Sequence, residues 1–399
     1  MARPLKSDAL PPPLMTSEPG SFAQATIVRR KPQIVEDVLR DNDYPQEIRD
    51  SLAMLARELR GDVIRPLGEP APDAEYWHDQ WCPYAGRTWL DVPWYFAEAF
   101  FYRRLLEAVR YFQPGLWQGH DPFEVAKRRQ IEGPGGALTA AGQALVELPA
   151  EPTAAAQALL YASLWGNRAD LSNPQVLAQA AAPQRARTLL IDDSPPLVAF
   201  LTHGAPHGRL DAICDNAGVE ATFDLLLADL ILEQGWAGRV RLHLKPYPFF
   251  VSDAMVKDVR QLIARLEGAS EPLVRAAGDR LATRLRAGAL ELADHPFWTS
   301  AYAFLEMPDD LRQELAQADL VLIKGDANYR RLLGDRHWPT TARLSEIAAY
   351  FPTPFATLRT LKAEIMVGLA HGEAERLAAE DAEWLINGRH GLIQFVVPA

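Results

Sequence analysis

The chain has 399 residues, of which 48% are hydrophobic and 23% are charged, and its formal net charge is −11. The composition is ordinary for a water-soluble globular protein. The acidic balance argues against a surface built for nucleic acid or for an anionic membrane. Because single hydrophobic cores stop growing at roughly 250 to 300 residues, a chain of this length is expected to form two domains or one domain with a large appendage.

Two cysteines, Cys82 and Cys214, exclude a disulfide framework and fit a reducing cytoplasm. The first twenty residues contain Pro11-Pro12-Pro13 and no apolar run of the length that a signal peptide needs. No stretch of 18 uninterrupted apolar residues occurs anywhere. We therefore expect a cytoplasmic protein that does not cross a membrane. The sequence does not predict its oligomeric state.

The first part of the chain has the pattern of helices. Apolar residues recur three or four positions apart over 34–39, 48–59 and 94–112, and strong strand patterns are missing there. A glycine-rich loop at 133–136 and an alanine-rich helix around 154–156 follow. These patterns predict an N-terminal all-helical domain over residues 1–180.

After about residue 185, short apolar strands alternate with helices, which is typical of a parallel sheet covered on both faces. The helices are expected at 223–232, 256–266 and 273–285. The fold class predicted for residues 181–399 is α/β, a three-layer α/β/α sandwich with a mainly parallel sheet. The strands are expected at 188–191, 210–214, 240–244, 320–323, 364–367 and 392–397.

Polar side chains follow three of these expected strands. Asp215 and Asn216 follow one strand, with Glu220 a helical turn later, while Asp253 and Asp326 follow two others. The carboxyl ends of parallel strands meet at one edge of a sheet, where α/β proteins bind ligands. Carboxylate and amide oxygens are the ligands that Mg²⁺ and Mn²⁺ prefer, so we expect a divalent metal site. The alternative is that these residues only cap helices and turns, as Asp and Asn often do.

Cationic residues accompany the polar ones. Lys324 directly precedes the Gly325-Asp326 turn, and Lys362 comes after Arg359 and Thr360, just before the strand expected at 364–367. Phosphoryl transfer needs positive charge beside the metal, since its catalysis is mostly positioning and neutralisation of charge. The alternative for each lysine is an ordinary solvated position on the surface.

Four ordered motifs resemble the damage-control phosphatase family, formerly a domain of unknown function. The Arg-Thr-x-Lys motif resembles the motif that characterises the third subfamily of this family, which includes acidic-residue methyltransferase-like proteins. The resemblance extends into the helical half at 88–94, 101–104 and 164–167. The four motifs are Asp215-Asn216-Ala217-Gly218-Val219-Glu220, the Lys-Pro-x-Pro-x-Phe-Val-Ser-Asp run ending at Asp253, Lys324-Gly325-Asp326-Ala327-Asn328-Tyr329-Arg330, and Arg359-Thr360-Leu361-Lys362.

The resemblance implies a metal-dependent phosphatase of small phosphorylated metabolites, most of all sugar phosphates such as fructose 1-phosphate or fructose 6-phosphate. It implies a divalent cofactor, Mn²⁺, Ni²⁺ or Co²⁺, with Mg²⁺ also possible. The metal ligands would be Asp215, Asn216 and Asp253, and the catalytic residues Asp215, Asp253 and Asp326. A conservative departure, Ala327, lies within the third motif. The substrate-binding positions would be Asp215, Asn216, Glu220, Lys324, Gly325, Asp326, Ala327, Asn328 and Lys362, with Arg359, Thr360 and Asn167 as secondary candidates.

Two other functions stay open. Glu220 and Asp253 fall where family members described as methyltransferases were assigned contacts to S-adenosylmethionine. A carboxyl methyltransferase is disfavoured because Asp192-Asp193-Ser194 stands where a glycine-rich nucleotide loop would follow the first strand. The other possibility is a non-catalytic sugar-phosphate-binding module. The helical half is expected to supply a wall or lid, with Asn167, Arg168 and Asp170 as its first candidates.

Overall fold

The computed structural model describes residues 10–133, 135–166 and 188–398. Its first part is helical, as the apolar spacing predicts. No helix of the described residues is both long enough and apolar enough to cross a membrane. The helices of this part are α1 (Phe22–Ala25), the π-helix η2 (Thr26–Arg30), α2 (Lys31–Asp41), α3 (Gln46–Glu58), α4 (Ala74–Trp81), the 3₁₀ turn η3 (Cys82–Tyr84), α5 (Trp94–Ala108), α6 (Glu124–Glu132), α7 (Ala137–Glu147) and α8 (Pro152–Trp165).

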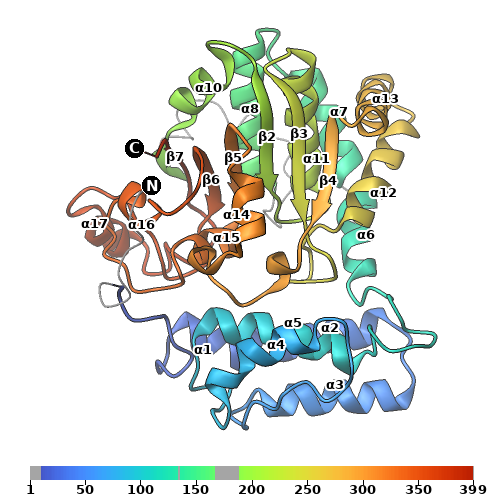
Figure 1. Ribbon diagram of the computed structural model, residues 1–399, viewed down its shortest axis with the longest axis vertical. Helices are drawn as coiled ribbons and strands as arrows, with labels where there is room; N and C mark the ends of the chain where they lie inside the picture. Colours follow the sequence, from blue (N-terminus) through green and yellow to red (C-terminus); the bar gives the residue numbers. More distant parts are fainter. Residues whose placement is uncertain (1–9, 134, 167–187, 399) are drawn as a thin grey trace.

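A seven-stranded sheet forms the centre of the rest of the molecule, in the order β1-β7-β6-β5-β2-β3-β4 (Figure 1). Every neighbouring pair is parallel except β6 and β7, which are antiparallel. The expected mainly parallel sheet is therefore confirmed. The strands are β1 (Leu189–Asp192), β2 (His207–Ile213), β3 (Ala237–Leu244), β4 (Leu290–Asp294), β5 (Leu320–Lys324), β6 (Phe355–Thr360) and β7 (Gly391–Val396).

Two strand predictions need correction. Residues 364–367 are irregular, and the strand lies before them as β6, whose Thr357 and Arg359 are completely buried. Polar residues in a buried strand break the apolar run that marks such strands in a sequence. The prediction also missed β4, because Glu291 and Asp294 interrupt its apolar run in the same way.

Alternate residues of the central strands face two hydrophobic cores. Leu320 and Leu322 of β5 pack into one core, and Val321 and Ile323 into the other. Helices on both faces complete the sandwich, because a parallel sheet must be covered on both sides. The first core holds residues of α7, α8, α10 (Ser194–Thr202), α11 (Val219–Glu233), α12 (Val256–Glu267) and α13 (Pro272–Ala287), while the second holds residues of the N-terminal helices, α14 (Asp309–Leu315), α15 (Asp326–Leu332), α16 (Leu344–Ile347) and α17 (Glu373–Glu380).

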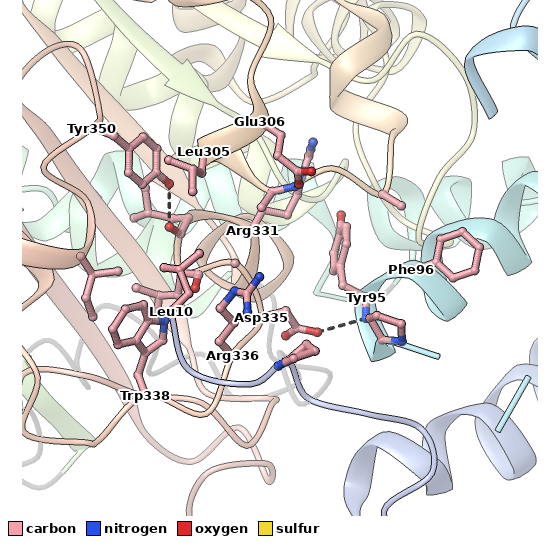
Figure 2. A pocket seen from close by; sticks show the side chains of 18 of the residues that line it. Leu10, Tyr95, Phe96, Leu305, Glu306, Arg331, Asp335, Arg336, Trp338 and Tyr350 are labelled. Atoms are coloured by element: carbon pink, nitrogen blue, oxygen red, sulfur yellow. Dashed lines mark hydrogen bonds between the residues drawn. The ribbon is translucent and has the colours of Figure 1, made fainter. Parts of the chain in front are cut away.

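The helices α1 to α5 form a separate layer beyond the carboxyl ends of β2, β3 and β4, toward which the arrowheads point (Figure 1). Their core includes residues from one face of the sheet, while α7 and α8 belong to the core on the other face. A domain boundary at residue 180 stays a prediction, and packing alone would assign α7 and α8 to the sheet domain. Where α5 meets the segment after α15, a cavity of about 370 Å³ remains, lined by Tyr95, Phe96 and Arg331 among others (Figure 2).

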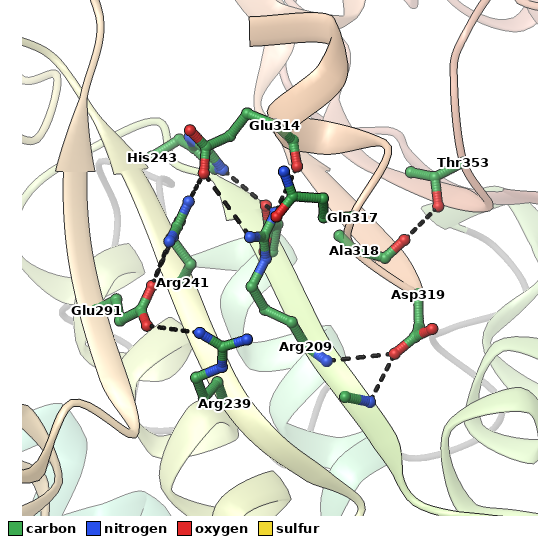
Figure 3. A network of polar contacts seen from close by, with 12 residues as sticks. Arg209, Arg239, Arg241, His243, Glu291, Glu314, Gln317, Ala318, Asp319 and Thr353 are labelled. Carbon is green, nitrogen blue, oxygen red and sulfur yellow. Dashed lines mark hydrogen bonds and ion pairs between the residues drawn. The ribbon is translucent and has the colours of Figure 1, made fainter. Parts of the chain in front are cut away.

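A network of buried charges joins β2 and β3 to α14 (Figure 3). Arg209 contacts Asp211 with two nitrogens, at 2.7 and 3.0 Å, and His243 Nε2 lies 2.9 Å from the same carboxylate. Glu314 of α14 pairs with Arg209 and Arg241. Removing one partner of such a network would leave another charge buried without compensation, which is strongly destabilising.

Candidate functional site

The predicted site residues follow four neighbouring strands. In the order β6-β5-β2-β3, Asp215 follows β2, Asp253 follows β3, Asp326 begins α15 directly after β5, and Lys362 follows β6. The chain runs outward from β2 to β4 and then returns to β5 on the other side of β2. Such a reversal of strand order opens a crevice at the carboxyl ends of the strands, which is the usual ligand site of open α/β sheets.

The Asn216 side chain connects the other polar residues of the first motif by hydrogen bonds. Its side-chain Nδ2 donates to Asp215 Oδ2 at 2.7 Å and to Glu220 Oε2 at 2.9 Å, while its Oδ1 accepts from the Ser252 hydroxyl. Its backbone forms an isolated antiparallel bridge with Asp253. The three expected metal ligands, Asp215, Asn216 and Asp253, therefore lie next to one another although they come from two loops.

The loop that carries Asp253 has an unusual backbone. Phe250 and Val251 have positive φ values of 43° and 65°, which are strained for bulky and β-branched residues. Two hydrogen bonds hold this loop to the first motif, from the Ala217 amide to the Ser252 carbonyl and from the Ala254 amide to the Asp215 carbonyl, at 2.7 and 2.8 Å. Such strain persists only where the surrounding structure fixes it, and it concentrates at functional sites.

Gly325 lets the ends of β2 and β5 approach closely. Its φ and ψ of 85° and 169° belong to a region that glycine almost alone occupies. A Cβ atom there would lie 2.1 Å from Asp215 Oδ2. Asn328 adds a second link, because its side-chain amide donates to the carbonyls of Cys214 and Lys324 at 3.2 and 2.8 Å. The Lys-Gly-Asp-x-Asn motif thus fixes the position of the Asp215 carboxylate.

A cavity of about 120 Å³ lies between these strand ends and the helical layer. Ser252 and Phe250 border it beside the predicted residues. Of the predicted substrate positions, Glu220, Lys324, Gly325 and Asn328 are not among the described residues that line it. The lining comprises Asp215, Asn216, Phe250, Ser252, Asp253, Asp326, Ala327, Arg330 and Lys362 from the α/β part and Phe22, Thr26, Arg30, Lys31, Trp94, Glu98 and Tyr102 from the helical layer.

The two central carboxylates lie in an environment that disfavours negative charge. Burial, followed by the repulsion of Glu220 and Asp253, raises the pKa of Asp215 well above its usual range. Burial also raises the pKa of Asp253 to about 6, although Lys245 opposes the rise at an Nζ–Oδ2 distance of 3.4 Å. Asp253 Oδ2 is buried without a hydrogen-bond partner. A bound cation would compensate both carboxylates.

Lys324 does not lie where a substrate-binding residue must lie, since such a residue has to be exposed to the cavity. It is completely buried, and its Nζ contacts Glu220 Oε1 at 2.8 Å and Asp224 Oδ1 at 3.0 Å. Although burial opposes the change, Asp224 and Glu220 raise the pKa of Lys324, so it stays charged. Lys324 and Glu220 support the first motif from behind the cavity.

Asp326 and Arg359 form a second fixed pair. Arg359 Nε donates to Asp326 Oδ1 at 2.7 Å, and the Lys362 amide donates to the same oxygen at 3.1 Å. The Arg359 side chain is completely buried, whereas the Asp326 side chain is 15% exposed. Arg359 therefore orients Asp326 toward the cavity without lining it. Thr360 is buried at the end of β6.

The helical wall of the cavity carries charges that sequence reasoning missed. Lys31 Nζ lies 2.6 Å from Glu98 Oε1, and Arg330 pairs with the other Glu98 oxygen at 2.5 Å. Burial lowers the pKa of Lys31 to about 8 although Glu98 opposes the change. Against the effect of burial, Lys31 and Arg330 lower the pKa of Glu98 to about 2. The available signal was Glu98 itself, the carboxylate inside the apolar and aromatic first half of α5.

Asn167, Arg168 and Asp170, expected in the wall or lid, lie outside the described residues. Among the described residues, one group of three carboxylates is close enough together to hold a metal ion, with ligand atoms within 4.8 Å. It lies at α6 and α12 and comprises Asp121, Glu124 and Asp258. Lys127 and Lys257 each form ion pairs with both Asp121 and Asp258, with N–O distances of 2.8 to 3.4 Å. With Arg128, which lies 4.0 Å from Glu124, these two lysines balance the three carboxylates, which makes the Asp215 region the better candidate.

Comparison with known proteins decides the family. Residues 26–377 match the model of the damage-control phosphatase ARMT1-like domain. The chain belongs to this family. It is similar to the damage-control phosphatase ARMT1 of Danio rerio, with 33% identity over 98% of each chain. The corresponding proteins of Mus musculus and Homo sapiens are 31% and 30% identical, over 96% and 98% of this chain and 98% and 99% of their own.

A solved structure has a related fold. The crystal structure of a DUF89 family protein from Pyrococcus horikoshii aligns with a TM-score of 0.51 and 15% identity, over 94% of this chain and 98% of that chain. The similarity confirms the expected fold class. Family membership makes the protein a damage-control phosphatase in general terms and gives a small molecule as the class of substrate.

Proposed function

We propose that the protein is a metal-dependent phosphatase that hydrolyses a small phosphorylated metabolite, a sugar phosphate such as fructose 1-phosphate or fructose 6-phosphate. One observation carries the proposal. A cavity at the carboxyl ends of four neighbouring strands brings Asp215, Asn216 and Asp253 together opposite cationic residues of the helical layer. This is the combination that binding a metal and a phosphate group requires.

The charges around the cavity support an anionic substrate only with a cation bound. Its lining contains four acidic and four basic side chains. Glu98 is neutralised by Lys31 and Arg330, and Asp326 by Arg359. Asp215 forms no ion pair with the described residues, and Asp253 has Lys245 Nζ at 3.4 Å as its ionic partner, so the two carboxylates share one close cation. A divalent cation between them would turn the cavity positive and favour a phosphate dianion.

The residues present fit such a cation. Asp253 Oδ2 is buried without a hydrogen-bond partner, 3.4 Å from Lys245 Nζ. Asp215 adds a carboxylate and Asn216 an amide oxygen, which also accepts from the Ser252 hydroxyl, and both are of the kind that Mg²⁺ and Mn²⁺ prefer. When bound, the cation would polarise the phosphoryl group and lower the pKa of a water molecule. Mn²⁺, Ni²⁺, Co²⁺ and Mg²⁺ are the metals to compare.

Each side chain then has a proposed role. Lys362 and Arg30, which both line the cavity, would bind the phosphate oxygens. Asp326, oriented by Arg359, would hold a substrate hydroxyl or accept a proton. Lys324 would act indirectly, since its contacts keep Glu220 and through it Asn216 in place. The aromatic rings of Trp94 and Tyr102 would exclude water from one side.

The test is phosphate release from fructose 1-phosphate by protein stripped of metal and reloaded with each cation in turn. We expect Asp253→Asn to lose at least about 100-fold in kcat/KM, as removal of a single transition-state interaction often does. Asp309→Asn is the matched control, because this carboxylate is 92% exposed on α14. Circular dichroism and thermal unfolding establish that both variants are folded. Full turnover by folded Asp253→Asn would refute the metal assignment.

The two other functions predict different outcomes. A binding module would bind fructose 1-phosphate, detected by calorimetry, without releasing phosphate under any metal. A carboxyl methyltransferase would bind S-adenosylmethionine at millimolar concentration or below. Phosphate release without S-adenosylmethionine binding supports the phosphatase over both.

A further inference from the structure

The larger cavity, of about 370 Å³, lies apart from the candidate active site. It is bordered by α5, the turn at Ala301 to Glu306 and the segment from Arg331 to Trp338 (Figure 2). Its lining shares no residue with the cavity that holds Asp215. The size falls in the range of 300 to 1,000 Å³ that is typical of small-molecule sites.

Arg331 gives this cavity a buried positive charge. Its side chain is 1% exposed and forms no ion pair with the described residues, and its guanidinium carbon lies 4.2 and 5.2 Å from the ring centres of Phe297 and Phe304. It donates instead to the backbone carbonyls of Phe297, Trp298 and Tyr302 and to the Ser300 hydroxyl. Burial lowers the pKa of Arg331. A buried charge without an ionic partner is costly, and an anion would relieve that cost.

Two further polar groups point to an anion at the same place. Tyr95 is 5% exposed and lines the cavity, and its hydroxyl has no hydrogen-bond partner among the described residues. Its ring centre lies 5.8 Å from the Arg331 guanidinium carbon. Arg336 also lines the cavity and lacks a carboxylate partner within the described parts of the chain, donating only to the Pro11 carbonyl at 2.6 Å.

The two acidic residues of the lining form no ion pair with these arginines within the described residues, although the charge of Glu306 partly offsets that of Arg331. Asp335 accepts from Arg330 through both oxygens, at 2.7 and 2.9 Å, and from the Tyr95 amide at 3.0 Å. Glu306 is exposed and accepts from the Ala303 amide at 2.9 Å. The rest of the wall is largely apolar and aromatic, with Phe96, Leu305, Leu332, Trp338, Ile347 and Tyr350.

We propose that this cavity is a second ligand site, which binds a small organic anion with an aromatic or apolar body. The acidic group of the ligand lies against Arg331, Arg336 and the Tyr95 hydroxyl, and its body packs against Trp338 and Leu305. The charges and the apolar wall select an organic carboxylate, sulfonate or phosphate over a bare inorganic ion. This inference is independent of the proposed phosphatase activity.

The test uses 8-anilinonaphthalene-1-sulfonate, a fluorescent aromatic anion, with neutral N-phenyl-1-naphthylamine as its uncharged analogue. We expect the sulfonate to bind the folded protein with one molecule per chain and the neutral analogue to bind about tenfold more weakly, since one charge-assisted hydrogen bond accounts for that difference. Arg336→Gln, at a partly exposed position, should raise the Kd of the sulfonate about tenfold.

Two more variants locate the probe. Ala303→Trp, which fills the cavity from its rim, should abolish one-to-one binding in protein whose circular dichroism is unchanged. Arg30→Gln is the matched control, because it removes an arginine from the other cavity, and it should leave the Kd unchanged. The proposal is overturned if Arg336→Gln binds like the unaltered protein, if Arg30→Gln alone weakens binding, or if the neutral analogue binds equally well.

Discussion

Replacing Gly325 with alanine tests the geometry of the candidate site most directly. The new methyl group would lie 2.1 Å from Asp215 Oδ2, so the carboxylate must move away from it. The backbone conformation itself costs alanine about 1 to 3 kcal/mol. Displacing Asp215 also breaks its 2.7 Å hydrogen bond from Asn216, which adds about 1 to 3 kcal/mol for a buried group.

We therefore expect Gly325→Ala to lower the free energy of unfolding by about 2 to 6 kcal/mol. Misplacing a reacting group by about 1 Å can cost on the order of 100-fold in rate. The metal affinity and the rate of phosphate release should fall together, because both depend on the position of Asp215. Urea unfolding, Mn²⁺ titration and phosphate release from fructose 1-phosphate measure the three effects.

Gly372→Ala is the control for backbone strain. Gly372 also precedes a helix and has a φ of 82°, but no atom lies within 4 Å of its would-be Cβ. It should cost about 1 to 2 kcal/mol and leave turnover unchanged. If Gly325→Ala unfolded like Gly372→Ala and kept full turnover, the close approach of Gly325 to Asp215 would have no functional importance and the reasoning would fail.

Other predictions concern charge. Lys31 has its pKa lowered from 10.5 to about 8, so between these pH values the unfolded chain binds a proton that the folded protein has lost. The free energy of unfolding should therefore rise with pH over that window by up to about 3 kcal/mol more than it does in Lys31→Met. Urea unfolding of both proteins at pH 8, 9 and 10 measures this difference. If the free energies of unfolding of the two proteins changed in parallel with pH, the prediction would be contradicted. Asp211→Asn should cost about 3 to 5 kcal/mol, because it leaves Arg209 buried without its main carboxylate (Figure 3). Arg239→Gln, whose side chain is 53% exposed, should cost less than about 1 kcal/mol in the same assay. Equal losses in both variants would show that burial of this network does not determine its contribution.

The sequence was informative wherever structure depends on local pattern. Apolar periodicity located α2, α3, α5, α8, α11, α12 and α13 and five of the seven strands. Asp215, Asn216, Asp253 and Asp326 were expected at one edge because parallel strands end together, whereas Lys362 was expected just before a strand and instead follows β6. The polar strand β6 was not predicted, since the burial of Arg359 depends on Asp326, a carboxylate distant in sequence.

The helical side of the cavity could not be derived in this way. Its Lys31 and Glu98 become meaningful only when α2 and α5 face the sheet, and nothing local in the sequence encodes that contact. Lys324 is the opposite case. Its motif marks it correctly as part of the site region, but only the three-dimensional contacts with Glu220 and Asp224 reveal that it lies behind the cavity.

The pairing of β1 has a consequence for synthesis of the chain. Among the described strands β1 pairs with β7 alone, and Leu189 meets Gly391 in this pairing. During translation β1 therefore emerges from the ribosome long before its partner and keeps both edges unpaired meanwhile. Unpaired strand edges recruit other chains, and pairings distant in sequence form slowly. Chaperone dependence in the cell, and aggregation of chains truncated before β7, are the behaviour to expect of this topology.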